Sequence, residues 1–523
     1  MSLYFVSIGM WLASMTISPG NFDRATKPAI IDYQHYIDAN SILMIVSNVG
    51  LGANDYAGLF GHGYGMYYPF VDVQNIQNGT EIKSPLYSFS LWIGGEVGGV
   101  PHVAIADFAS EYWPGPIRAG SYNPEADTMS AYRVYRLYAD SLASNPNRDY
   151  LEWPDSLGAP VTSSGKPRLT GSQTLWSVYN DANPARHTLI AGSSAPLGVE
   201  VRQTTWATNA VGQERLIYIE YDLFNRSSLT ISNFYIGAYY DPDIGGAEDD
   251  LTGCDSTTGI FYAYNATNSD IVYGSTPPAL GVKLLFGPVV SSPGDSAWYF
   301  GRRVAGYRNL KLHSYIGYLN GDDPQSALES YRLLQGLKRD GDSLPNGSKF
   351  SFPGDPVSAV GDLDTIPSNL HGLGSVGPID LLPGDSQSVL VKIGVGQGAD
   401  RLSSISDLRD ILNSPDSLPT DSPIDSLILL PSSFMLEQNY PNPFNPQTTI
   451  QYTVRSRIGV SIDIYDMLGR HVRKLVDAVK GSGTYRANWN GCDDTGRPVP
   501  TGVYVYRLRA GEAEQSKKML LLK

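Results

Sequence analysis

Six carboxylates lie within 15 residues near the middle of the chain, directly after a predicted strand that ends at Tyr240. Like charges this close repel one another unless they are neutralised, and a calcium ion, with roughly six to eight oxygen ligands, neutralises them well. Gly245 and Gly246 allow the loop to curl around an ion. The spacing is not that of an EF-hand. The sequence therefore predicts an irregular calcium site with the candidate ligands Asp241, Asp243, Asp249, Asp250 and Asp255; the alternative is a solvated acidic loop.

Motifs for catalysis are missing from the sequence. The seven histidines are scattered without a His-Glu-x-x-His motif, and there is no Gly-x-Ser-x-Gly elbow and no Walker loop. Residues 372–377 match the dinucleotide fingerprint letter for letter, but the residues after them indicate a strand and not the helix that a phosphate needs. We therefore expect no catalytic residue, no organic cofactor and no enzymatic activity.

A secreted glycoside hydrolase or carbohydrate-binding protein is the alternative. A glycoside hydrolase needs two carboxylates in a cleft, and aromatic side chains stack on sugar rings. The chain supplies many acids, 8 Trp and 34 Tyr, with aromatic clusters at 64–68 and 112–113. The same aromatics suit the core of a β-sandwich, and the sequence offers no way to choose a carboxylate pair.

Short strands must position these residues. Only 17% of the residues are charged, and 54 Gly and 35 Pro indicate many tight turns. Short runs between glycine-rich turns predict strands at 41–47, 87–93 and 103–106, and alternating apolar and polar residues predict strands at 216–223, 231–239 and 389–395. Two helices are expected, at 324–337 after the capping candidate Asp323 and at 402–412. The predicted fold class is all-β: multidomain β-sandwiches with a few short helices.

Charge and cysteine content restrict the partners. The net charge of −14 argues against a nucleic-acid-binding protein, which needs a basic face, and favours solubility outside the cell. Cys254 and Cys492 are too few for a disulfide framework, so we expect two unpaired thiols. No stretch reaches 18 apolar residues, so no helix that crosses a membrane is expected.

Composition divides the chain into five segments. Residues 1–22 are apolar and are either a remnant of a signal peptide or a strand; residues 3–15 are a candidate strand for donation to a neighbouring copy. A β-rich domain at 23–165 and a sandwich at 166–413 with the acidic loop follow, with one large sandwich as the alternative. Residues 414–433 are rich in Pro, Ser and Asp and predict a linker, and a compact unit fills 434–523.

The last unit carries a distinctive string. Residues 436–446 read Leu-Glu-Gln-Asn-Tyr-Pro-Asn-Pro-Phe-Asn-Pro, short alternating strands follow, and the end is rich in lysine. The turn spacing predicts an immunoglobulin-like sandwich. The string closely resembles the type A C-terminal sorting domain of the type IX secretion system. The resemblance implies export, recognition by the outer-membrane secretion machinery, and a place outside a Gram-negative cell or on its surface, often with later removal of the domain.

The body resembles secreted proteins that carry this sorting domain, at 171–184, 241–255 and 262–268, and that resemblance brings no known activity. We therefore expect a secreted or cell-surface structural protein: a self-associating component of an extracellular filament, sheath or surface layer, or an adhesin. The expected partners are the type IX machinery and further copies of the chain, with a surface glycan as a further candidate and no nucleic acid.

Overall fold

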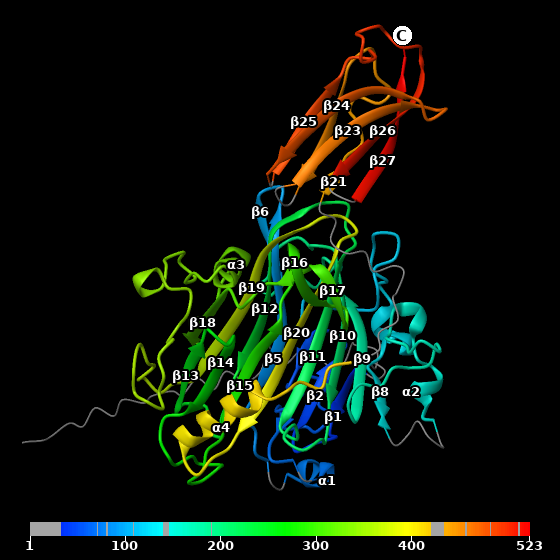
Figure 1. The fold of residues 1–523 in the computed structure, drawn as a ribbon. Coiled ribbons are helices and arrows are strands. Elements are labelled where there is room, and N and C mark those ends of the chain that lie inside the picture. The colour runs from blue at the N-terminus through cyan, green and yellow to red at the C-terminus, as the bar shows by residue number, and fades with distance from the viewer. Residues whose placement is uncertain are drawn as a thin grey trace, which may run out of the picture.

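The computed structural model describes residues 33–70, 72–79, 82–107, 109–139, 146–189, 191–419, 434–454, 458–481, 483–510 and 513–522. The predicted apolar segment at 1–22 and residues 420–433 of the predicted linker lie outside the described residues. Figure 1 shows a larger β-rich body, residues 33–419, and a smaller C-terminal unit, residues 434–522.

The first sheet of the body gathers strands from both ends of the body sequence, all of them antiparallel to their neighbours. In spatial order it contains β1 (Gln34–Ile37), β2 (Leu43–Ser47), β3 (Leu51–Gly52), β5 (Ser88–Val97), β12 (Ile231–Asp241), β19 (Leu370–Leu381) and β18 (Ser314–Leu319), with β4 (Met66–Tyr67) beside β2 and β6 (Val100–Ala104) beside β5.

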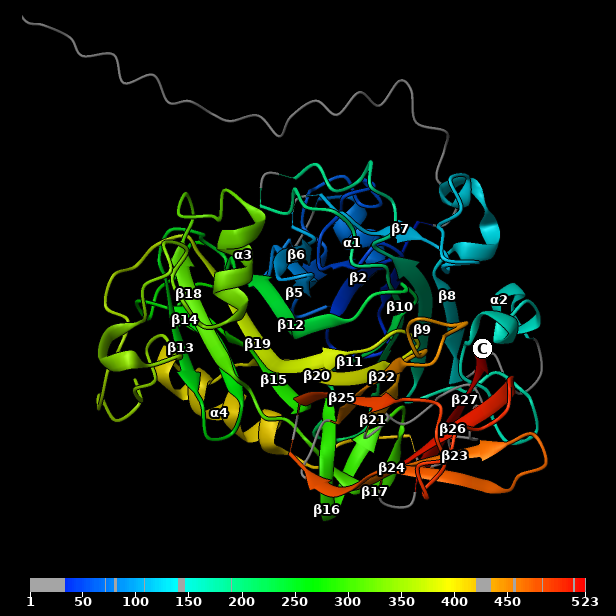
Figure 2. The same cartoon turned by 90° about the horizontal axis from the view of Figure 1, so that it is seen from above.

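The second sheet lies face to face with the first, as Figure 2 shows from above. In spatial order it contains β13 (Asp250–Asp255), β14 (Ile260–Asn265), β15 (Ala279–Phe286), β20 (Ser386–Gly396), β11 (Leu216–Asn225), β10 (Val199–Ala207), β9 (Gln173–Asn180) and β7 (Trp113–Pro114), with β8 (Tyr135–Tyr138) beside β9. A separate hairpin, β16 (Val289–Tyr299) and β17 (Arg302–Asn309), packs beside β20.

One hydrophobic core fills the space between the two sheets. Alternate residues point inward from each strand, for example Leu91 and Ile93 on β5 and Val391 and Ile393 on β20, and all four are buried. Because β5 pairs with β12 and β8 pairs with β9, the segments 23–165 and 166–413 share both sheets. The described body is therefore one large sandwich, as the alternative interpretation had it, and residue 165 does not separate two domains.

Helices cover the outside of the sandwich. The helix expected at 324–337 is α3 (Ala327–Leu334), and its cap is Ser326, whose hydroxyl accepts from the Glu329 amide at 3.3 Å; the prediction that Asp323 caps it is wrong. The second expected helix is confirmed as α4 (Arg401–Asn413). The remaining helical segments are α1 (Val73–Gln77), α2 (Arg148–Leu151), η1 (Ala126–Thr128), η2 (Ser130–Tyr132), η4 (Asp155–Leu157) and η5 (Pro345–Gly347).

The first six residues of the predicted linker are part of the body. The carboxylate of Asp416 lies 2.6 Å from Nζ of Lys392, whose side chain is fully buried on β20. The indole of Trp206 donates to the carbonyl of Ser417 at 3.1 Å. These contacts fix residues 414–419 on the outer face of the second sheet, so this part of the predicted linker belongs to the body.

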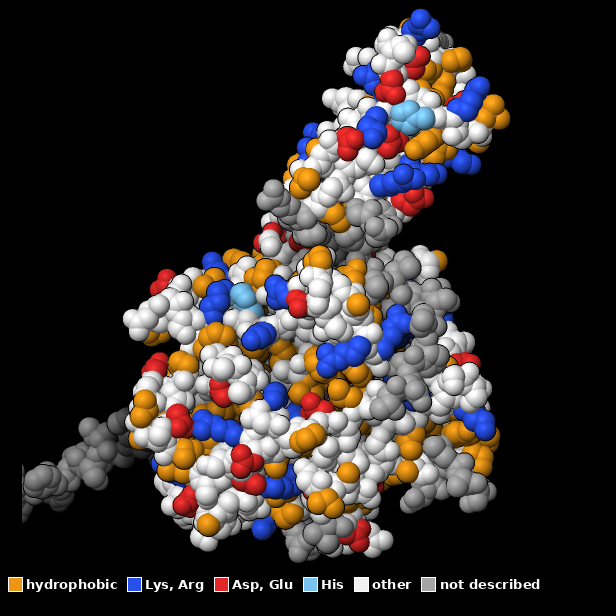
Figure 3. All heavy atoms as spheres, in the orientation of Figure 1, with side chains coloured by type: hydrophobic (Ala, Val, Ile, Leu, Met, Phe, Trp, Pro, Cys, Tyr) orange, Lys and Arg blue, Asp and Glu red, His pale blue; other side chains and the backbone are white. Residues whose placement is uncertain are grey.

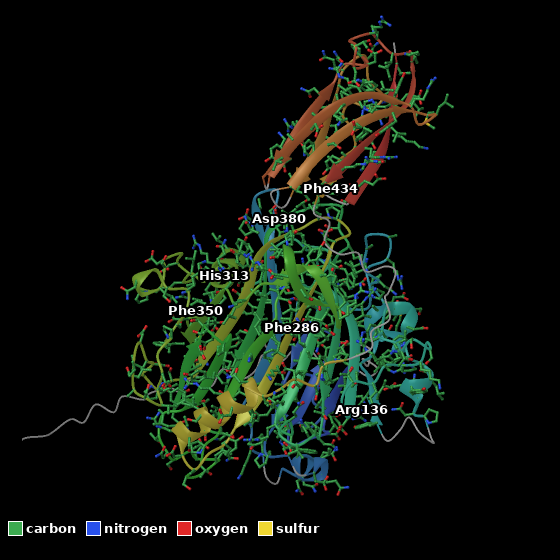
Figure 4. All side chains as sticks on the ribbon, in the orientation of Figure 1. Arg136, Phe286, His313, Phe350, Asp380 and Phe434 are labelled. Atoms are coloured by element: carbon green, nitrogen blue, oxygen red, sulfur yellow. The ribbon has the colours of Figure 1, made fainter. Side chains whose placement is uncertain are left out.

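The C-terminal unit is a smaller two-sheet sandwich that begins at Phe434, labelled in Figure 4. Its core includes Trp489, Tyr506 and Leu508. The immunoglobulin-like likeness stays a prediction, while the all-β fold class is confirmed. One sheet contains β21 (Phe434–Leu436), β22 (Thr448–Val454) and β25 (Gly483–Trp489), and the other contains β24 (His471–Lys480), β23 (Ile458–Asp466), β26 (Gly502–Ala510) and β27 (Ala513–Leu521).

Neither cysteine forms a disulfide: Cys254 is a buried free thiol and Cys492 is partly exposed. In the part of the chain that the structure describes, no helix has the length and apolar character needed to span a bilayer. Figure 3 shows acidic and basic side chains intermingled over the visible face of both units.

Candidate functional site

The predicted acidic loop begins where β12 ends and runs to the start of β13. Asp241 is the last residue of β12 and Asp250 is the first of β13, so the loop brings Asp241, Asp243, Asp249 and Asp250 to one end of the sandwich. Asp255 lies at the opposite end of β13, about 17 Å away at the usual rise of a strand. There it caps a turn by accepting from the Thr257 amide at 3.0 Å. Asp255 therefore does not share a site with the other four residues.

Hydrogen bonds from amide groups stabilise part of the negative charge of the loop. Oδ2 of Asp250 accepts from the Ile244 amide at 2.9 Å, and Oδ2 of Asp249 accepts from the Asn265 side chain at 3.0 Å. A residue that the sequence analysis missed, Asp270, accepts from the Gly246 amide at 3.0 Å. Gly245 (φ 74°) is required beside it, because a Cβ there would lie 2.1 Å from Oδ1 of Asp270.

Four buried carboxylate oxygens in this loop have no hydrogen-bond partner among the described residues: Oδ1 of Asp241, Asp243, Asp249 and Asp250. Burial raises the pKa of Asp243 to about 6 and raises the pKa of Asp250 well above its ordinary value. Across the described residues, no group of three or more His, Cys, Asp or Glu side chains is arranged to hold a metal ion. Calcium binding therefore stays a prediction.

A histidine that sequence reasoning did not select joins the loop. In the antiparallel pairing of β12 with β19, Tyr240 lies opposite Gly372, which brings Asp241 next to His371. Nδ1 of His371 donates to Oδ1 of Asp323 at 2.7 Å, and its Nε2 lies 3.7 Å from Oδ1 of Asp241. His371 is fully buried and bridges two carboxylates from different elements.

Electrostatics favour a charged imidazole at this position. Burial alone lowers the pKa of His371, but the hydrogen bond to Asp323 and the charges of Asp241, Asp323 and Asp107 outweigh burial and raise that pKa to about 9. Burial also opposes ionisation of Asp323, yet its bond to His371 lowers the pKa of that carboxyl below its ordinary value. The Asp323–His371 pair is therefore an ion pair at neutral pH.

Aromatic rings enclose the imidazole. The rings of Tyr239 and Tyr318 meet it edge-on at 5.6 and 5.5 Å between centroids, and Trp92 stacks on Tyr239 at 5.1 Å. Burial raises the pKa of both phenols well above the ordinary value, so both stay protonated. Neither hydroxyl has a hydrogen-bond partner in the described part of the chain. We call this group, with Asp241, Asp323 and His371, the histidine cluster.

A second pair of acids lies on the outer face of the other sheet. Glu220 and Asp222 are alternate residues of β11, so they point to the same side. Glu220 accepts from the Trp298 indole at 3.3 Å and the Gly301 amide at 3.0 Å, and burial raises the pKa of both acids. Trp298 stacks on Phe286 at 5.5 Å; Figure 4 labels Phe286 on this face. The hairpin of β16 and β17 thus covers Glu220.

Comparison with known families identifies the C-terminal unit. Residues 438–522 match the family described as the secretion system C-terminal sorting domain. This match confirms the resemblance found at 434–523. No curated protein matches the chain.

Solved structures give only distant likenesses. A polysaccharide lyase has 10% sequence identity, covers 62% of this chain and 34% of its own, and has a TM-score of 0.18. Dimeric latent PorU from Porphyromonas gingivalis has 10% sequence identity, covers 93% of this chain and 32% of its own, and has a TM-score of 0.17. The adhesin domain of Epf from Streptococcus pyogenes has 9% sequence identity, covers 67% of this chain and 92% of its own, and has a TM-score of 0.13. The chain spans about a third of the first two structures. TM-scores this low support no conclusion about fold or function.

Proposed function

From the premise that the C-terminal unit is a type IX secretion sorting domain, which places the chain outside a Gram-negative cell or on its surface, we propose a structural role there. The chain acts as a self-associating component of a filament, sheath or surface layer. The type IX machinery recognises the sorting domain during export, and further copies of the chain are its partners afterwards.

One observation carries this proposal: in the charged cluster that the fold brings together, the imidazole and one of its two carboxylates are closed to solvent, while the Asp323 side chain is 30% exposed. His371 is fully buried and Asp241 is 4% exposed. Groups that bind or transform a soluble substrate must reach it, whereas an ion pair whose imidazole is buried between tyrosine rings fixes the relative position of β12, β19 and the segment at Asp323. A rigid sandwich of this kind suits a structural building block better than it suits an enzyme, whose charged groups must be open to the substrate.

Calcium at the acidic loop is a separate proposal. The unpartnered oxygens of Asp243, Asp249 and Asp250 are hard ligands of the kind that calcium prefers. Asp241 is the weakest candidate of the four, because His371 already lies beside it. A bound cation would offset the repulsion between neighbouring carboxylates and stiffen the loop.

Sedimentation velocity of the purified full-length chain tests self-association. Across a concentration series from about 1 to 100 μM we expect the mean sedimentation coefficient to rise, since interfaces of about 1,600 Å² commonly give affinities in this range or tighter. A matched preparation without residues 1–20 tests whether the apolar segment is donated to a neighbour. A single monomeric species across the whole series contradicts the proposal.

A glycoside hydrolase is a second candidate, with Glu220 and Asp222 on one face of β11 as its pair of acids; it requires the hairpin of β16 and β17 to move off Glu220, which is 2% exposed. Release of reducing sugar from a polysaccharide panel, abolished in Asp222→Asn and unaffected in the exposed control Asp295→Asn, would replace the structural proposal. No release from the panel removes this candidate.

A further inference from the structure

A polar groove of about 630 Å³ lies on the C-terminal unit, within the size range of ligand sites. The alternation of β22 creates it: Ile450, Tyr452 and Val454 point into the core, and Thr449 and Gln451 point outward. On the neighbouring β25, Arg486 and Asn488 point outward between core residues. Glu437, Gln438 and Tyr440 complete the lining.

Cross-strand hydrogen bonds hold the lining side chains in place. Thr449 lies opposite Asn488 and Gln451 lies opposite Arg486 in the register of β22 and β25. The Thr449 hydroxyl donates to Oδ1 of Asn488 at 2.9 Å, and Nε of Arg486 donates to Oε1 of Gln451 at 3.2 Å. These two bonds orient the lining side chains before any ligand binds. Each bond uses only part of the hydrogen-bonding capacity of its side chains, so the rest is open to a ligand.

Both donors and acceptors remain available in the groove. The Nη atoms of Arg486, the amide nitrogens of Gln451 and Asn488 and the carboxylate of Glu437 make no hydrogen bond to the described residues. A sugar hydroxyl both donates and accepts, so it can use either kind of group. One Glu and one Arg cancel in charge, which favours a neutral ligand.

The ring of Tyr440 lies at the groove, and backbone hydrogen bonds fix the position of this residue. The Tyr440 amide donates to the Thr449 carbonyl at 2.9 Å, and the Thr449 amide donates back to the Tyr440 carbonyl at 3.0 Å. The Tyr440 residue is nevertheless 82% exposed. A large exposed ring next to polar groups suits a ligand with one apolar face and polar edges, such as a pyranose.

We propose that this groove binds a neutral oligosaccharide, with one pyranose ring stacked on Tyr440 and its hydroxyls bonded by Glu437, Gln451, Arg486 and Asn488. A peptide added as an extra strand is a poorer occupant, because β22 is already paired on both sides, and a strand added at the open edge of β25 would extend the sheet sideways and would not fill the groove on its face. The inference goes beyond the structural role proposed above: it gives the sorting domain a ligand of its own, through which a surface polysaccharide can hold the chain.

An array of neutral hexasaccharides (cello-, xylo-, malto- and chito-) probed with the full-length chain tests the proposal. We expect binding to at least one of them, and a loss of affinity of about tenfold or more in Tyr440→Ala, the size expected for one aromatic stacking contact together with the ring area it buries. Tyr440→Phe keeps the ring and should stay close to the parent. Leu468→Ala is the control, since Leu468 is 78% exposed on a turn outside the groove.

Every variant changes an exposed side chain, and equal melting temperatures confirm that all four proteins fold alike. Three results overturn the proposal: no binding to any hexasaccharide, binding that Tyr440→Ala leaves unchanged, or binding only to a charged heparin hexasaccharide added to the array. Sedimentation of Tyr440→Ala separates this inference from self-association, which should not change in that variant.

Discussion

Nδ1 of His371 lies 2.7 Å from Oδ1 of Asp323, although 48 residues separate them in the chain. This contact connects a strand of the first sheet to the segment before α3, where Asp323 was expected to cap a helix. Because the imidazole is buried between the rings of Tyr239 and Tyr318, the stability of the body depends on its protonation.

The pH dependence of stability follows from the pKa of His371, which rises from 6.5 to about 9 in the folded protein. The stabilisation is fully present below pH 6.5 and is lost as the pH rises through 9. We expect the free energy of unfolding of the body to fall by about 2–3 kcal/mol over this window. Urea unfolding at pH 6, 7.5 and 9 measures it.

The variant His371→Gln should be less stable at pH 6 and should lose most of this pH dependence. His471→Gln, whose imidazole is 41% exposed on the C-terminal unit, is the control and should behave like the parent. Equal slopes against pH for the parent and for His371→Gln would show that the imidazole is not charged in the folded body.

The buried ion pair of Lys392 and Asp416 predicts an asymmetric effect of mutation. The Lys392 side chain is fully buried, and its ammonium also donates to the Ser414 carbonyl at 3.3 Å. Asp416→Ala leaves a buried charge without its partner and should cost about 3 kcal/mol. The double variant Lys392→Met, Asp416→Ala should recover most of that loss in a urea titration. A double variant as unstable as the single one would refute this account.

The glycine at position 374 is predicted to be irreplaceable. A Cβ there would lie 2.2 Å from the ring of Phe261 in the opposite sheet. Gly374→Ala must push the sheets apart locally and should cost about 1–3 kcal/mol or more. Gly52→Ala is the matched strand control, because its nearest contact would be 3.4 Å away. Equal melting temperatures for the two variants would contradict the close packing at Gly374.

Metal titration decides the calcium proposal. Isothermal titration of metal-stripped protein should show calcium binding that disappears in Asp243→Asn, Asp250→Asn, because these changes remove two of the unpartnered oxygens. Asp255→Asn is the control and should bind as the parent does, since Asp255 lies at the far end of β13. No heat from the unmutated protein removes calcium from the account.

Sequence periodicity located the elements but not their partners. Alternation predicted the strands that became β11, β12 and β20, and the helix expected at 402–412 was confirmed as α4, because the spacing of apolar residues along a helix is a local signal. Strand pairing is non-local: β5 and β12 are far apart in the chain, so no local signal showed that they share a sheet.

The candidate site was predicted only where its residues are neighbours in sequence. The acidic loop was visible as a run of aspartates, whereas His371 meets it only through the register of β12 with β19. The motif at 372–377 illustrates the converse: its glycines lie in β19, where a Cβ at Gly372 would come within 2.1 Å of Tyr240. They allow close packing of β19 on its neighbours, which the sequence analysis did not predict; it expected only the strand that follows the motif.

The central claim is that copies of this chain build an extracellular structure. Electron microscopy of the native extracellular fraction, with the protein identified in the same particles by mass spectrometry, tests it most directly. The account predicts regular filaments, tubes or lattices that contain this chain. Dispersed monomers in that fraction would contradict it. They would favour the alternatives, hydrolysis by Glu220 and Asp222 or sugar binding in the groove at Tyr440.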